Sequence, residues 1–138
     1  MNTTSSVDEP NPVDQLGITA DHEVMEIGYD TDVDTDLRDA VIKTVGELHP
    51  DDTTDLMDAV LLWWRDDDGD LVDGLLDARS NLDDDGTVWL LTPKANRAGH
   101  IDPATISEAG PLAGLKATKT IPIEPDWLGI RMRLGKNS

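Results

Sequence analysis

The segment from Asp58 to Asp70, DAVLLWWRDDDGD, places the tightest constraint on the fold. Its apolar residues from Ala59 to Trp64 run without a break and are followed by Arg65 and a group of aspartates. A short, unbroken apolar run is typical of a strand that is buried on both faces, as the parallel strands of α/β proteins are. Ligand sites in such folds lie outside the carboxyl ends of the strands. We therefore expect any site of this chain to lie near residues 65–70.

Strand and helix patterns alternate along the rest of the chain. Strands are expected at 24–27, 59–64, 87–91, 115–123 and 128–134, and helices at 36–45, at 70–81 and from Asp102-Pro103 to Gly110-Pro111 or Gly114. Alternation of this kind favours a parallel sheet with right-handed crossovers. The short connection at 124–127 makes the last two strands an antiparallel hairpin. The pattern predicts one α/β domain at 14–135, a three-layer sandwich with about five strands, after a disordered tail at 1–13.

The charge of the chain is strongly negative and unevenly distributed. The sequence holds 29 acidic and 11 basic residues, for a net charge of −18; residues 1–85 carry −21 and residues 86–138 carry +3. Such acidity argues against nucleic acid and anionic membranes as partners, because both are bound through lysine and arginine. The acidity either serves solubility or forms a docking face for a basic protein partner.

Other compositional features narrow the class further. There is no cysteine, which excludes thiol catalysis and disulfides. No apolar run approaches the ~20 residues of a membrane span, and the N-terminus lacks the pattern of a secretion signal. We therefore expect a cytoplasmic protein with no membrane contact.

Motifs for chemistry are incomplete. No Gly-x-Ser-x-Gly elbow and no phosphate-binding Gly-x-x-x-x-Gly-Lys loop is present, and the three histidines have no metal-ligand spacing. Asn81, Asp83 and Asp85, followed by Gly86, match the first half of a calcium loop. Thr92 stands where that loop requires a glutamate, so a solvated helix-to-strand turn explains these residues better. We predict no catalytic residue, no cofactor and no metal.

One group of residues remains as a candidate site. In a parallel sheet, the loops that follow residues 27, 64 and 91 converge at one edge. The group comprises Tyr29, Asp30, Asp32, Arg65, Asp66, Lys94, Arg97 and His100. It either binds a small polar ligand or a protein loop, or its cations only offset the local acidity. Trp63 and Trp64 should point to opposite faces of their strand, and Trp127, at the hairpin turn, is expected to be exposed as a partner contact.

Two resemblances add to these expectations. The stretches Glu26–Asp30, Asp36–Ala40, Leu61–Asp73 and Val88–Lys94 resemble a family of small acidic actinobacterial proteins of unknown function, over nearly the whole length. The order of elements also resembles the later half of the class I S-adenosylmethionine methyltransferase fold, which is Rossmann-like. Val24–Gly28 is similar to the first strand and the start of the glycine loop of that fold.

The chain departs from the methyltransferase pattern in ways that bear on the cofactor. Tyr29, Asp30 and Asp32 stand where further glycines would let the backbone approach the cofactor. The strand that ends in the ribose-binding acid has no counterpart. The resemblance therefore implies a reduced scaffold that does not bind this cofactor. Two hypotheses follow. The chain is either a non-catalytic interaction or regulatory module, or it is a protein that binds a nucleotide or S-adenosyl ligand, or a weak enzyme, with its site at the strand ends.

Overall fold

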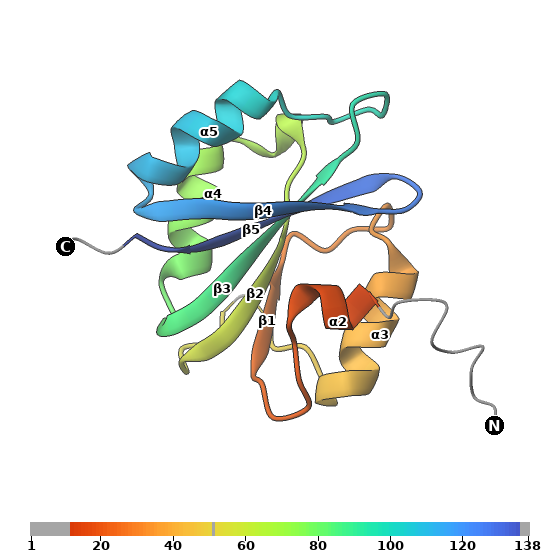
Figure 1. Cartoon of the computed structure of the whole chain (residues 1–138), viewed down its shortest axis with the longest axis vertical. Helices are drawn as coiled ribbons and strands as arrows, with labels where there is room; N and C mark the ends of the chain where they lie inside the picture. The colour runs from red at the N-terminus through yellow and green to blue at the C-terminus, as the bar shows by residue number, and fades with distance from the viewer. Residues whose placement is uncertain (1–11, 51, 136–138) are drawn as a thin grey trace.

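Five strands form one mixed sheet in the computed structural model, which describes residues 12–50 and 52–135 (Figure 1). The strand order is β1-β2-β3-β5-β4; β1, β2 and β3 are parallel, and β5 is antiparallel to both β3 and β4. The elements in chain order are α2 (Pro12–Leu16), β1 (Val24–Ile27), α3 (Thr35–Val45), β2 (Met57–Trp63), η1 (Asp66–Asp68), α4 (Leu71–Arg79), β3 (Leu82–Pro93), α5 (Pro103–Leu112), β4 (Leu115–Ile123) and β5 (Trp127–Leu134). The predicted α/β sandwich with a terminal antiparallel hairpin is confirmed.

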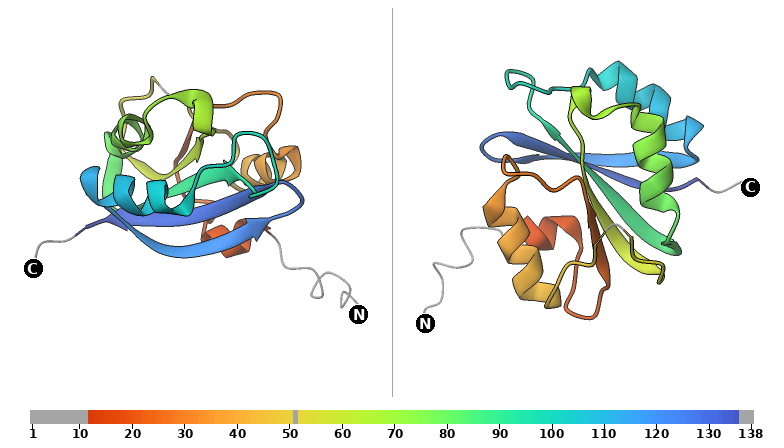
Figure 2. Two further views of the ribbon diagram at one scale, coloured as in Figure 1. Left: turned by 90° about the horizontal axis from the view of Figure 1, so that it is seen from above. Right: turned by 180° about the vertical axis from the view of Figure 1, so that it is seen from behind.

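Helices cover both faces of the sheet, as Figures 1 and 2 show: α2 and α3 lie on one face, and α4 and α5 on the other. Side chains of β2 alternate between the two cores. Val60 and Leu62 pack with α4, whereas Leu61 and Trp63 pack with α2 and α3. The apolar run is therefore buried on both faces, as predicted. Trp64 joins the α4 side, so the two adjacent tryptophans do point to opposite faces.

The two connections between parallel strands take different routes. The helices α3 and α4 lie on opposite faces of the sheet. The first connection follows the outer edge of β1, where the backbone N of His49 donates to Val24 O at 2.8 Å.

Aspartate side chains cap the starts of α4 and α5. The carboxylate of Asp70 accepts a hydrogen bond from Val72 N at 2.9 Å, and that of Asp102 accepts one from Ala104 N at 2.9 Å. An aspartate at this position satisfies one of the amide groups that a helix start leaves without a partner. Helix α5 ends at Leu112, between the two expected stops at Gly110-Pro111 and Gly114.

The third strand begins five residues earlier than predicted. Leu82 pairs with Met57 and Thr87 pairs with Ala59, so residues 83–86 bulge out opposite a single residue of β2. The expected helix-to-strand turn is therefore part of β3. Its aspartates hid the strand from sequence patterns, because they follow neither the apolar alternation nor the composition of a typical strand.

The start of the chain differs in part from the expected tail at 1–13. Residues 1–11 lie outside the described part of the structure. Pro12 and Val13 belong to α2, and the side chain of Val13 is buried in the core that α3 shares. Within 12–50 and 52–135, no helix is both long and apolar enough to cross a membrane.

Candidate functional site

Arg65 joins the carboxyl ends of the first two strands. It follows β2 directly, and only 9% of its surface is exposed. Its Nη1 donates to Gly28 O at 2.8 Å and to the carboxylate of Asp68 at 3.2 Å. Its Nε and Nη2 donate to the two carboxylate oxygens of Asp32 at 3.1 and 2.5 Å. The guanidinium group therefore links the loop after β1 to η1 from inside the sheet edge.

Trp127 covers this arginine from the side of the hairpin. The Arg65 guanidinium lies 5.4 Å from the centre of the Trp127 ring, which meets Trp63 edge-on at 4.9 Å. The indole Nε1 of Trp127 donates a hydrogen bond to Asp32 O at 3.2 Å. Only 3% of Trp127 is exposed, so the expectation of an exposed aromatic is wrong. Trp127 begins β5, and its ring packs inward on Trp63 rather than standing out from the turn.

A second charged group is buried beside the first. Glu26, on β1, is 9% exposed and accepts two parallel hydrogen bonds from Arg38, at 2.8 and 3.0 Å. Trp63 Nε1 donates to the same carboxylate at 2.9 Å. The Arg38 guanidinium lies 4.4 Å from the centre of the Tyr29 ring. Sequence reasoning did not select Glu26; a carboxylate inside a strand expected to be buried was the feature that indicated it.

The ionisation of this region reflects the internal pairing. The hydrogen bond from Arg65 holds the pKa of Asp32 below its ordinary value, against the opposing effect of burial. Burial lowers the pKa of Arg65, but its hydrogen bonds to Asp32 and Asp68 outweigh this and raise the pKa overall. Burial raises the pKa of Asp34. Arg65 is thus a permanent cation whose three nitrogens already donate to the protein, which suits a structural link rather than an acid, a base or an open anion site.

The remaining predicted cations are also paired. Lys94 Nζ forms an ion pair with Glu124, and Arg97 Nη2 forms one with Asp126. His100 turns the other way: its Nδ1 is 3.0 Å from Pro93 O, and the ring lies beside α5. The structure therefore does not bring His100 into the predicted group.

The acidic and aromatic candidates divide between two hollows. The first, about 270 Å³ in volume, is lined by Asp32, Pro93, Arg97, Ala98, Asp126 and Trp127. The second, about 470 Å³, lies beside β1 and is lined by Glu26, Gly28, Tyr29, Arg38, Leu48, His49 and Pro50. Arg65 lines neither hollow. Asp30 and Asp66 are exposed, and the backbone N of Asp66 donates to Gly99 O at 2.8 Å.

Gly28 is explained by packing. Its φ is +83°, and a Cβ placed on it would lie 2.2 Å from Trp63 O. Only glycine tolerates both the dihedral angle and the close approach. The glycine that resembled the start of a cofactor loop is thus required by contact with β2.

The weak metal candidates are engaged in other contacts. The side-chain amide of Asn81 donates to Thr53 O, and a carboxylate oxygen of Asp83 accepts a hydrogen bond from Asp85 N at 3.1 Å. Among the residues that the structure describes, no three histidine or acidic side chains are grouped to hold a metal ion.

Sequence comparison identifies relatives of unknown function. Residues 13–136 match the family model described as "Protein of unknown function (DUF3052)". The chain is 46% identical over 119 residues to "Uncharacterized protein Rv2239c" of Mycobacterium tuberculosis H37Rv and, equally, to "Uncharacterized protein Mb2263c" of Mycobacterium bovis; each match covers 86% of this chain and 75% of the relative. Mycobacterial relatives agree with the actinobacterial resemblance of the sequence.

Structure comparison identifies methyltransferases. The pyocyanin biosynthetic protein PhzM matches with a TM-score of 0.68 at 11% identity, over 91% of this chain and 54% of PhzM. The CcbJ methyltransferase from Streptomyces caelestis matches with 0.62 at 10%, over 91% and 88%. The O-methyltransferase NcsB1, in complex with S-adenosyl-L-homocysteine and 1,4-dihydroxy-2-naphthoic acid, matches with 0.61 at 13%, over 81% and 49%. The chain spans about half the length of PhzM and NcsB1. At these identities the match establishes the fold alone, and the predicted methyltransferase-like fold is confirmed.

Proposed function

The chain belongs to the family described as "Protein of unknown function (DUF3052)", and from this starting point we propose that it is a non-catalytic interaction or regulatory module on a methyltransferase-like scaffold. Its partner would be a basic protein segment that contacts the carboxyl ends of the strands. In this role the scaffold is a rigid support for a charged surface.

The observation that carries the proposal is the position of Arg65. Open α/β sheets bind their ligands outside the carboxyl ends of the strands. Here the guanidinium of Arg65 bonds Gly28 O, Asp32 and Asp68 at that place, and the ring of Trp127 lies beside it. These groups satisfy one another, so a ligand that entered between the strand ends would have to break a buried, charge-assisted network.

The outer surface at the strand ends supports a basic partner. We define this strand-end surface as residues 28–32, 65–70, 94–100 and 124–126. It holds eight acidic residues and three basic residues, a formal charge of −5. All three cations are engaged in ion pairs within the surface, whereas Asp66, Asp67 and Asp70 are exposed. Such a surface attracts a lysine- or arginine-rich segment and repels nucleic acid.

Crosslinking in native cell extract tests the proposal. We expect the tagged protein to recover a stoichiometric basic partner, with crosslinks that map to the strand-end surface. Asp66→Asn with Asp67→Asn should weaken recovery, because both side chains are exposed on that surface. Asp52→Asn with Asp84→Asn, which removes the same charge from elsewhere on the chain, is the matched control. Absence of a stoichiometric partner, or equal loss with both pairs, would refute the proposal.

A second candidate function is binding of a small nucleotide-like ligand in the hollow beside Trp127. The hollow of about 270 Å³ combines an aromatic ring with Asp32, Arg97 and Asp126, and NcsB1 of the same fold holds an S-adenosyl ligand. Thermal-shift measurements with S-adenosylmethionine, S-adenosylhomocysteine and nucleotides test this candidate. Binding must raise the melting temperature, so no shift at millimolar ligand would exclude it.

A further inference from the structure

A separate pocket lies on the opposite side of the sheet from α3, between α5 and the terminal hairpin. Its volume is about 190 Å³, and its walls are largely apolar: Ile101 and Ile106 from the α5 side, and Leu128 and Ile130 from β5. We call it the Thr92 pocket, after the residue that β3 contributes. It shares no lining residue with the hollow beside Trp127.

Thr92 brings a buried hydroxyl to this apolar pocket. It follows Val88 and Leu90 at two-residue spacing along β3, so its side chain stands on the same face of the sheet, towards α5. The residue is 1% exposed, and its Oγ1 has no hydrogen-bond partner among the described residues. Buried polar groups are nearly always paired, because leaving one unpaired costs free energy. The hydroxyl therefore has an unused hydrogen-bonding capacity beside the pocket, which a guest can reach once the side chains at the wall shift slightly.

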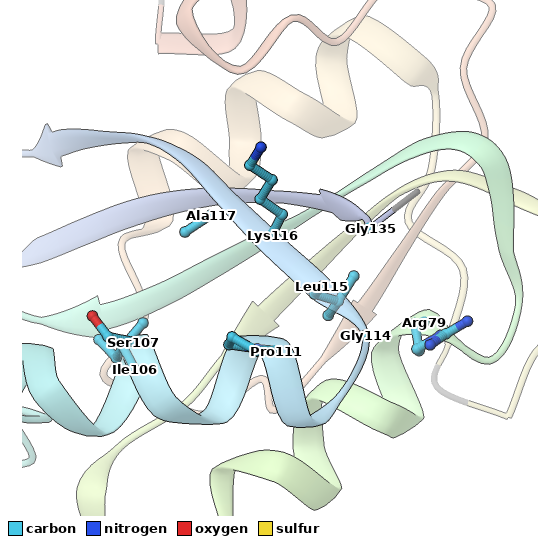
Figure 3. A pocket seen from close by; sticks show the side chains of 10 residues that line it. Arg79, Ile106, Ser107, Pro111, Gly114, Leu115, Lys116, Ala117 and Gly135 are labelled. Atoms are coloured by element: carbon cyan, nitrogen blue, oxygen red, sulfur yellow. The ribbon is translucent and has the colours of Figure 1, made fainter. Parts of the chain in front are cut away.

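The pocket adjoins a wider groove at the surface. Figure 3 shows this groove between α5 and β4; its volume is about 690 Å³, and it shares Ile106, Ser107 and Ala117 with the Thr92 pocket. The cations at the groove do not line the pocket itself. In Figure 3 the side chain of Lys116 extends away from α5, and Arg79 Nη1 donates to Ala113 O at 2.9 Å.

We propose that the Thr92 pocket binds a small, uncharged, largely apolar molecule that carries one hydroxyl or carbonyl group. The size fits, since an apolar protein cavity of about 150 Å³ binds benzene. The walls favour an apolar body, and the single buried hydroxyl favours a ligand with one hydrogen-bonding group. None of the described residues that line the pocket has an acidic or a lysine or arginine side chain, so the burial of a charged ligand there would be strongly unfavourable.

His100 also lines the pocket. Because Pro93 O can only accept a hydrogen bond, Nδ1 of His100, 3.0 Å away, donates to it. A bound hydroxyl or carbonyl group is expected near Thr92 Oγ1, and the apolar body between Ile106 and Leu128.

Phenol, toluene and benzoate are the probes for this proposal, because they share a ring and differ in one group. Methyl chemical shifts of Ile106, Leu128 and Ile130 report binding by NMR titration. We expect saturable shifts with phenol, weaker binding of toluene and no binding of benzoate. Absence of saturable phenol shifts at these methyls, or benzoate binding as tight as phenol, would overturn the proposal.

Two variants separate the hydroxyl from the cavity. Thr92→Val keeps the side-chain shape and should weaken phenol by about threefold to tenfold, the loss of one hydrogen bond, while toluene is unchanged. The melting temperature of the same variant should be no lower than that of the native chain, because the removed hydroxyl makes no hydrogen bond to the protein. Ser107→Leu, at the shared wall, should weaken both probes, and Glu108→Leu, exposed on the same helix, should weaken neither. An unchanged phenol-to-toluene ratio in Thr92→Val, or equal effects of the two leucine variants, would refute the assignment.

Discussion

Replacement of Arg65 by methionine measures how much the strand-end network stabilises the fold. Methionine keeps the unbranched apolar stem, which can still cover Trp127, and removes only the guanidinium group. Gly28 O then loses its donor at 2.8 Å, at a cost of about 1–3 kcal/mol for a buried carbonyl. Asp32, whose side chain is 54% exposed, and Asp68 lose ion pairs worth at most about 1 kcal/mol each after solvent screening.

The total expected loss for Arg65→Met is therefore about 2–4 kcal/mol in the free energy of unfolding. Urea denaturation followed by tryptophan fluorescence measures it, with an unchanged m-value as the check on two-state behaviour. Arg97→Met is the matched control: its ion pair with Asp126 joins two largely exposed side chains, so a loss within about 0.5 kcal/mol is expected. A loss below 0.5 kcal/mol for Arg65→Met, or equal losses in the two variants, would show that the network is not what holds the strand ends.

The pH dependence of the same variant is a further readout. Arg65 lowers the pKa of Asp32 in the folded chain. A carboxylate with a lowered folded pKa contributes stability that is fully present above its unfolded pKa, about 3.9, and is lost as the pH falls through the folded value. The difference between native chain and Arg65→Met should therefore be constant from pH 5 to 7 and decrease below pH 4.

Three further predictions concern single residues. Gly28→Ala should destabilise the fold by more than about 2 kcal/mol in the same urea assay, because the new Cβ meets Trp63 O. Gly46→Ala is the control: its φ is +99°, but the space around it is open, so a loss of about 1 kcal/mol is expected. Glu26→Gln should cost about 1–2 kcal/mol through the lost charge on the paired Arg38, and salt should not reduce this difference if the pair is shielded from solvent. Asp34→Asn should stabilise the chain at pH 7, because burial raises the pKa of Asp34 and disfavours its ionised form. At pH 3 this carboxyl is protonated in both the folded and the unfolded chain, so calorimetry should show no increase in melting temperature for the variant.

Local patterns predicted most of the secondary structure. The apolar run at 59–64, the Asp70 and Asp102 caps and the terminal hairpin are each specified within about a dozen residues, and the structure contains all of them. Periodicity and capping depend on neighbours along the chain, so one sequence contains enough information to assign them. Resemblance to the methyltransferase fold then added the Rossmann-like architecture, whereas the order of the strands in the sheet comes from the structure alone.

Features that depend on distant partners were missed or misplaced. The inward turn of Trp127 depends on Trp63, 64 residues away in sequence. The start of β3 depends on pairing with Met57, which the aspartates at 83–85 do not indicate. The candidate loops do lie at one end of the sheet, but which cation pairs with which carboxylate is decided by side-chain geometry. The chain carries so many acids that spacing alone selects no pair.

Ionic strength distinguishes the two surfaces that are proposed to bind other molecules. A basic partner at the strand-end surface would be held by exposed carboxylates, and exposed charges are screened over about 8 Å at physiological salt. Its affinity should therefore fall steeply between low and high salt. The Thr92 pocket offers largely apolar walls with neutral hydroxyls, and none of the described residues that line it has an acidic or a lysine or arginine side chain, so phenol affinity should be nearly independent of salt. Arg65 and Trp127 occupy the space between the strand ends. The small apolar ligand is therefore expected in the Thr92 pocket, and the basic partner on the strand-end surface. A salt-dependent loss of phenol binding would contradict this separation, since it would mean that a charged group contributes to the apolar pocket.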